Sequence, residues 1–323
     1  MKSGRKEKKH FPVKRILIPL GVVLMPSVID KGVFTLAQKS RYRRNHEIIY
    51  SSYLGEVNYT AYGAGEPLIL IHDTFKGGGL WEWDKNILEL GKKYRVYAMD
   101  LPGFGLSNKP WTVYTAYSYT RLINDFIKDV IGEPVYAVGS GHSAADLIQV
   151  AAMEPNAFKK IVAVCPTGIE GGAISGLDRW KRLILSSSII GTSIYTWAVS
   201  KNSIKNFLET EVFYNKRKFV TEETINTCWF YAHAVNERGK HTYAAFKSDY
   251  LTTNIRRSLK TLKVPLLTVW GEETLSNPVS NMDIIEGIRP DYNYAVFEKT
   301  RMLPHYENSI EFNKLVKDFF NPE

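Results

Sequence analysis

The hydrophobic positions of this chain fall into two repeating kinds of segment. Short, mostly apolar runs are typical of strands that are buried on both faces of a sheet, and they lie at residues 68–72, 94–100, 135–138, 161–165, 264–270 and 294–297. Apolar residues recur at helical spacing at residues 87–90, 117–131, 143–153 and 310–320. Residues 55–62 alternate apolar and polar positions, as an antiparallel strand does. This alternation of strands and helices predicts a mostly parallel sheet flanked by helices.

One long stretch breaks the pattern. Residues 166–263 are aromatic and helical in spacing, are interrupted by Ser and Asn, and contain no buried strand run. We interpret them as a helical cap inserted between two strands. Its aromatic residues are expected to roof a pocket over the sheet; they are Trp180, Tyr195, Trp197, Phe207, Trp229, Phe230 and Tyr231. The predicted units are a tail at 1–41, a core in two parts at 42–165 and 264–323, and the cap at 166–263.

The N-terminal tail is basic and then apolar. Residues 16–29 carry no charge, and as a helix they would reach about 21 Å, short of the roughly 30 Å of a bilayer core. The segment fits a signal peptide, a short membrane anchor or interfacial segment, or a helix packed on the domain. We expect residues 1–31 to hold the protein at a membrane. If they span it, their basic residues keep the N-terminus in the cytoplasm and put the body on the other side.

Composition and charge narrow the function classes. The 323 residues are 44% hydrophobic and 23% charged, as in soluble globular proteins. Residues 1–15 carry +6 of the formal net charge of +9, so the body is nearly neutral and a nucleic-acid-binding face is not expected. Cys165 and Cys228 form no metal-binding or redox motif, and the seven histidines show no paired spacing. No metal and no cofactor are predicted.

Five motifs occur in the order and at the spacing found in the α/β-hydrolase family, which the chain resembles over roughly residues 55–320. They are His72 nine residues before Trp81, the turn Asp100-Leu-Pro-Gly-Phe-Gly-Leu-Ser107, Val138-Gly139, residues 264–271, and Pro304-His-Tyr-Glu307. The resemblance implies an α/β-hydrolase fold: a mostly parallel sheet flanked by helices, with an inserted helical cap. It also implies where a catalytic triad should stand.

All three triad positions are substituted. In the family, a nucleophile sits at the tip of a strained strand-to-helix turn. A gapless match over residues 138–155 puts Gly141 at that tip. The acid position holds Thr274 and the histidine position holds Met302. Glycine cannot attack and methionine cannot accept a proton, so the resemblance implies a catalytically degenerate site.

A displaced catalytic set is the alternative. Ser143 follows the tip by two residues, and His305 or His142 could serve as its base, with an acid from Asp73 or Glu273. The oxyanion loop of the family reads His-Gly, whereas here it reads His72-Asp73-Thr74. A carboxylate at that place opposes a developing oxyanion.

Two hypotheses therefore stand beside a purely structural role. The first, which we favour, is a membrane-held, non-catalytic α/β-hydrolase-fold protein that binds a small apolar ligand or a protein partner. Its ligand-binding region would include His72, Asp73, Thr74 and His142, and Asp73 would meet a donor or cation on the ligand. The second is an esterase-like hydrolase that uses the displaced set.

Overall fold

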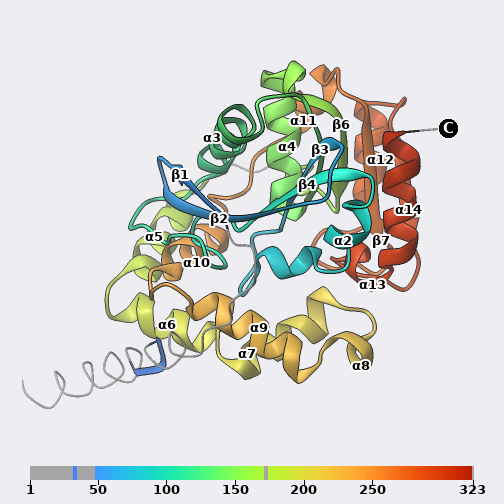
Figure 1. The fold of residues 1–323 in the computed structure, drawn as a ribbon. Coiled ribbons are helices and arrows are strands. Elements are labelled where there is room, and N and C mark those ends of the chain that lie inside the picture. The colour runs from blue at the N-terminus through green and yellow to red at the C-terminus, as the bar shows by residue number, and fades with distance from the viewer. Residues whose placement is uncertain (1–31, 35–47, 171–173, 322–323) are drawn as a thin grey trace, which may run out of the picture.

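The computed structural model describes residues 32–34, 48–170 and 174–321. A single eight-stranded sheet runs through the middle of the molecule in the order β1-β2-β4-β3-β5-β6-β7-β8 (Figure 1). The strands are β1 Ile48–Ser52, β2 Gly55–Tyr62, β3 Glu66–Ile71, β4 Tyr94–Met99, β5 Val135–Ser140, β6 Phe158–Val164, β7 Leu266–Gly271 and β8 Asn293–Phe297.

The six apolar runs of the sequence are the six parallel strands β3 to β8. Each pairs in parallel with its neighbour in the sheet, whereas β2 pairs antiparallel with both β1 and β4. Every residue of β5 and β7 is buried, as strands covered on both faces require. Strand β1 was not predicted, because it lies at the sheet edge, where most of its side chains face solvent and apolar residues do not alternate.

Helices cover both faces of the sheet. On one face α3 (Ala116–Phe126), α4 (Gly141–Met153), α11 (Arg256–Thr261) and α12 (Asn281–Ile288) contact one another in succession. On the other, α2 (Ile87–Leu90) contacts α14 (Ser309–Phe320), which follows α13 (Pro304–Glu307). The mostly parallel sheet flanked by helices is therefore confirmed.

Helices α5 to α10, which lie between β6 and β7 in the chain, form a cap below the sheet in Figure 1. They are α5 Gly176–Ser186, α6 Ile190–Ala198, α7 Lys201–Phe207, α8 Lys216–Phe219, α9 Glu222–His233 and α10 Gly239–Lys247. The buried Lys109 ties the cap to the core, since its Nζ donates to the carbonyls of Tyr231 and Ala234 at the end of α9, each at 2.8 Å. The last helix of the stretch, α11, packs on α4 and α12 and so lies in the core layer.

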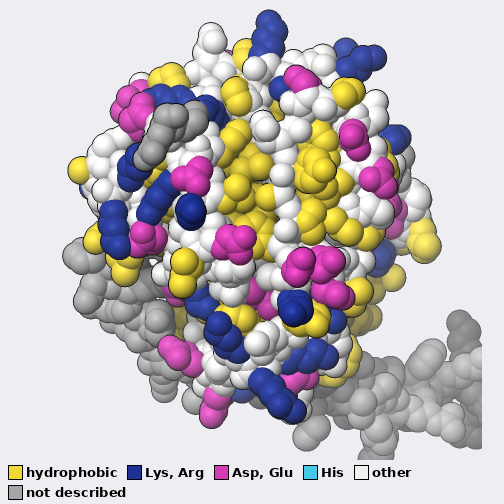
Figure 2. Space-filling model, turned by 90° about the vertical axis from the view of Figure 1, so that its right-hand side faces the viewer, with side chains coloured by type: hydrophobic (Ala, Val, Ile, Leu, Met, Phe, Trp, Pro, Cys, Tyr) yellow, Lys and Arg dark blue, Asp and Glu magenta, His cyan; other side chains and the backbone are white. Residues whose placement is uncertain are grey.

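The edge of the sheet at β8 and the lengths of the helices bear on how the protein could meet a partner or a membrane. β8 forms one edge of the sheet, where Tyr294 and Val296 are exposed. Figure 2 shows hydrophobic side chains gathered in the middle of the side formed by the last elements, with charged ones around them. Within the described part of the chain, no helix is long and apolar enough to cross a membrane. Residues 1–31, on which the anchor prediction rests, lie outside the described residues.

Candidate functional site

The candidate site lies where the strand order reverses. β4 and β5 both follow β3 in the chain but flank it on opposite sides, so the loops after β3 and β5 diverge at the carboxyl ends of the strands. Such switch points in parallel sheets form a crevice where ligands bind. The loop after β3 supplies residues 72–74, and the turn after β5 supplies Gly141 and His142.

Gly141 stands at the tip of a strand-to-helix turn. β5 ends at Ser140, α4 begins at Gly141, and Gly141 has a φ of +53°, in the left-handed region that strains other residues. This is the turn on which α/β-hydrolases place their nucleophile. Here the tip carries no side chain.

The carboxylate of Asp73 occupies the space that a side chain at the tip would need. A Cβ added to Gly141 would lie less than 3.0 Å from the Asp73 Cγ and from both of its carboxylate oxygens, closer than real Cβ atoms approach. The place of the missing nucleophile is thus filled by a carboxylate from the neighbouring loop.

The same carboxylate takes up two backbone donors. Asp73 Oδ1 accepts hydrogen bonds from the backbone N–H groups of Thr74, at 2.7 Å, and His142, at 2.9 Å. The N–H of the residue after the tip and one from the loop after β3 form the oxyanion hole in α/β-hydrolases. These donors stabilise an oxyanion in a working enzyme. In this chain both already bind an anion.

Asp73 is held in its ionised form. Burial alone would raise the pKa of this carboxyl, but the His142 ring and the two N–H donors outweigh burial and hold the pKa below its usual value. His142 Nδ1 lies 3.2 Å from Oδ1. The second carboxylate oxygen of Asp73, Oδ2, has no hydrogen-bond partner among the described residues. Asp73 also lines a large cavity.

A cavity of about 480 Å³ opens above the turn. The three substituted triad positions, Gly141, Thr274 and Met302, all line this cavity. Asp73 and His142 line it as well. Phe207 and Phe246 add apolar wall, and the charged residues of the lining are Glu170, Lys181, Glu211, Lys247 and Asp249. The volume lies in the range of small-molecule sites.

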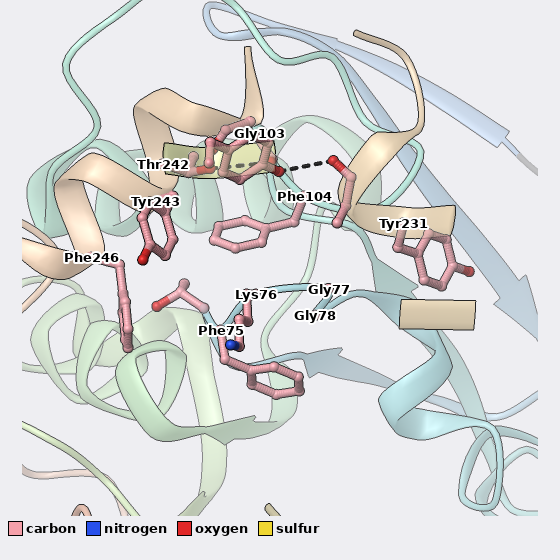
Figure 3. Close-up of a pocket in the computed structure, with 14 residues that line it drawn as sticks. Phe75, Lys76, Gly77, Gly78, Gly103, Phe104, Tyr231, Thr242, Tyr243 and Phe246 are labelled. Carbon is pink, nitrogen blue, oxygen red and sulfur yellow. Dashed lines mark hydrogen bonds between the residues drawn. The ribbon is translucent and has the colours of Figure 1, made fainter. Parts of the chain in front are cut away.

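A second, much smaller cavity of about 20 Å³ shares Phe246 with the first. Figure 3 shows the rings of Phe104, Tyr243 and Phe246 directed toward this space from the core and from α10. Its volume suits about one water molecule. Aromatic side chains therefore fill this part of the space under the cap, while the space above Gly141 stays open.

The predicted aromatic roof is only partly in place. Phe207 lines the large cavity, and Tyr195 and Tyr231 line the small one. Trp180 and Trp197 instead face solvent, with exposed fractions of 68% and 74%. An apolar helical stripe fits a roof or an outer face equally well, so spacing alone did not decide its direction.

The structure does not bring Ser143 and His305 together. Ser143 Oγ is buried and donates to the His72 carbonyl at 2.6 Å. His305 is also buried, stacks on Trp83 at 4.2 Å and lies with Nε2 3.1 Å from Glu82 Oε1. Neither Ser143 nor His305 is among the residues that line the large cavity.

Glu82 is a residue that the sequence reasoning missed. Its carboxylate is fully buried and accepts hydrogen bonds from Ser140 Oγ and from the backbone N–H of Asp73, and it faces His305. It therefore holds the loop that carries Asp73 against the end of β5. A lone acid between Trp81 and Trp83 was the signal that could have identified it.

The remaining predicted residues hold the loops in place. His72 is fully buried; its Nδ1 lies 2.8 Å from the Asp73 carbonyl oxygen, and its Nε2 accepts from Leu101 N–H at 3.0 Å. Thr274 donates to the Gly271 carbonyl at 2.8 Å. Thr252, which was not predicted, places Oγ1 3.4 Å from His142 Nε2.

No group of three or more His, Cys, Asp or Glu residues in the described ranges is arranged to hold a metal ion.

Comparison with known proteins agrees with this geometry. The profile described as "Alpha/beta hydrolase family" matches residues 68–311. A 2-hydroxy-6-oxo-6-phenylhexa-2,4-dienoate hydrolase of Comamonas testosteroni is 23% identical over 88% of this chain and 97% of its own length. A pimeloyl-[acyl-carrier protein] methyl ester esterase of Aeromonas hydrophila is 22% identical over 81% of this chain and 98% of its own.

The fold has solved counterparts as well. A meta-cleavage product hydrolase from Pseudomonas fluorescens, solved as a mutant in complex with acetates, superposes with a TM-score of 0.68 at 23% identity, over 82% of this chain and 94% of that one. The profile match covers most of the chain and agrees with the strand order and the turn at Gly141. The chain therefore belongs to the α/β-hydrolase family.

Proposed function

We propose that this protein is a catalytically degenerate member of the α/β-hydrolase family that is held at a membrane and binds a small ligand above Gly141. One observation carries the proposal: the Asp73 carboxylate fills the place of the nucleophile and accepts both N–H donors of the oxyanion hole. A substrate carbonyl placed there would meet a negative charge where a hydrolase supplies donors.

The same carboxylate defines the ligand. Asp73 lines a cavity whose walls also carry Phe207, Phe246 and Met302, so the favoured ligand is a small apolar molecule with one hydrogen-bond donor or cation. An ammonium group would pair with the Asp73 carboxylate, and its hydrocarbon part would lie against Phe207, Phe246 and Met302.

A thermal-shift measurement with hexylammonium as the probe tests this assignment. At ten times its dissociation constant a ligand stabilises the folded state by about 1.4 kcal/mol, which raises Tm measurably. We expect hexylammonium to raise the Tm of the full-length protein and to have no effect on Asp73→Asn. Hexanoate, with the same chain and the opposite charge, is the matched control. An equal shift in Asp73→Asn, or one as large with hexanoate, contradicts the role of Asp73.

Hydrolysis by a displaced set is the second candidate. One geometric arrangement favours it. The His142 ring lies between Asp73 and Thr252, with Nδ1 3.2 Å from Asp73 Oδ1 and Nε2 3.4 Å from Thr252 Oγ1, which is the order of acid, base and hydroxyl in a catalytic triad. The occupied oxyanion donors argue against it. We expect hydrolysis of short-chain aryl esters to be no faster with the wild type than with Thr252→Ala or with Ser140→Ala/Ser143→Ala. A loss of about a hundredfold or more in either variant would establish a working hydroxyl.

Membrane association is the remaining part of the proposal. It is supported by the +6 charge of residues 1–15 followed by the fourteen uncharged residues 16–29. A basic cluster beside an apolar segment favours anionic lipid surfaces.

A further inference from the structure

Helix α5 presents an apolar stripe that nothing in the described part of the chain covers. None of its eleven residues is buried, although it carries Leu177, Trp180, Leu183 and Ile184, all of them exposed. Their spacing places these four side chains in one stripe along the helix. A helix packed only on its own domain would turn such a stripe inward.

The next helix also carries exposed apolar residues. α5 packs beside α6, where Ile190 and Trp197 are exposed seven residues apart, and Ile189 just before α6 is exposed as well. We call this set of seven side chains the α5–α6 face: Leu177, Trp180, Leu183, Ile184, Ile189, Ile190 and Trp197. Exposed apolar residues gathered on two neighbouring helices are typical of an interaction site.

Basic residues flank the stripe on α5. At helical spacing, Arg179 lies along one side of it and Lys181 along the other, and both are exposed. Apolar residues with Trp among them, bordered by Lys and Arg, are typical of helices that lie in the interface of a bilayer with their basic groups at the lipid headgroups. A second protein would not require this flanking charge.

A short described segment near the N-terminus, residues 32–34, packs against α6. Phe34 is buried in the cap, with its ring centroid 6.3 Å from that of Tyr195 in α6, and Figure 1 shows residues 32–34 next to α6. The chain before Phe34 comprises the apolar residues 16–29 and the basic residues 1–15. The proposed membrane segment therefore precedes, in the chain, a residue that is anchored on α6.

We propose that the α5–α6 face docks on an anionic lipid bilayer. Its apolar side chains enter the interface, and Arg179 and Lys181 meet the headgroups. Because Lys181 also lines the large cavity, docking places that cavity beside the lipid. This inference rests on the membrane association in the proposed function and adds a second, separate contact to it.

An environment-sensitive label on the face tests the docking. Cys165 and Cys228 are buried, so Leu183→Cys in the full-length chain gives an accessible thiol on α5 for a nitrobenzoxadiazole label. Vesicles of phosphatidylcholine with phosphatidylserine should shift its emission to the blue and raise it about twofold or more. The same label at Ile310→Cys, on α14 and 86% exposed, should not change.

Sedimentation with the same vesicles gives an independent readout. We expect Trp180→Gln/Leu183→Gln to weaken vesicle binding about tenfold or more, since it removes two apolar anchors. The matched control, Trp111→Gln/Ile310→Gln, changes two apolar side chains outside the face that are even more exposed, and should leave binding unchanged.

Three results would overturn the docking. If the protein sediments with vesicles but the emission of the label at Leu183→Cys does not change, the α5–α6 face does not contact the bilayer and the N-terminal tail alone binds the membrane. Failure to sediment at all would exclude both the face and membrane association, while the hexylammonium measurement would still report on the cavity. A label that is already shielded before vesicles are added would show that a second copy or residues 16–29 cover the face.

Discussion

Replacement of Gly141 by serine probes the most unusual contact in the site. The new Cβ would collide with the Asp73 carboxylate, and the serine would have to adopt a φ of +53°. A left-handed conformation costs a non-glycine residue about 1–2 kcal/mol, and overpacking adds about 1–3 kcal/mol. Gly141→Ser should therefore lower the free energy of unfolding by about 2–5 kcal/mol.

Removal of the carboxylate should rescue part of this loss. In an Asp73→Ala background the collision is gone and only the backbone strain remains, so Gly141→Ser should then cost about 1–2 kcal/mol. Urea unfolding of the four proteins in the cycle gives the coupling energy, which we expect to be about 1–3 kcal/mol. Gly139→Ala is the control, because its Cβ would meet Leu147 Cδ1 at 2.7 Å and not Asp73. Equal costs of Gly141→Ser in both backgrounds would refute the placement of Asp73.

The remaining predictions concern pH, the cap and the tail. Because the folded-state pKa of Asp73 is lowered, its ionised form stabilises the fold above the unfolded pKa of about 3.9, and this stabilisation is lost as the pH falls through the folded pKa. The difference in unfolding free energy between wild type and Asp73→Asn should shrink in that acidic range, and a difference that is flat with pH would contradict it. Burial lowers the pKa of His233 to about 4, so protonation favours the unfolded chain and stability should fall between about pH 6.5 and 4. His233→Gln should flatten that part of the urea-unfolding profile, and an unchanged profile would assign the loss to other groups. Deletion of residues 1–31 should strongly weaken sedimentation with membranes, leaving only the contact of the α5–α6 face, and should leave the circular dichroism spectrum unchanged; full-length protein that stays in the soluble fraction without detergent would rule out the anchor.

Much of the fold could be predicted because its signals are local. Each buried strand is a short apolar run, and the turn at Gly141 lies in a segment that matches the family without a gap. The substitutions at Gly141, Thr274 and Met302 could be named for the same reason, and all three line one cavity. Edge strand β1 has no such signal, since most of its side chains face water.

The chemistry of the site depends on contacts between segments far apart in the chain. The contact of Asp73 with the N–H of His142 spans 69 residues, and that of Glu82 with Ser140 spans 58. The sequence indicated that a carboxylate follows His72 but not that it reaches the tip of the turn. The directions of Trp180 and Trp197 were mispredicted because a helical stripe has the same spacing whether it faces a pocket or solvent.

Reaction with a fluorophosphonate probe, followed by peptide mass mapping, tests catalytic degeneracy most directly. The probe labels an activated hydroxyl irrespective of the substrate, so the natural ligand need not be known. With Gly141 at the tip and the oxyanion donors bound to Asp73, we expect no adduct on Ser140, Ser143 or Thr252 in the folded protein. An adduct on any of these three residues that disappears on unfolding would show an activated nucleophile and contradict the account.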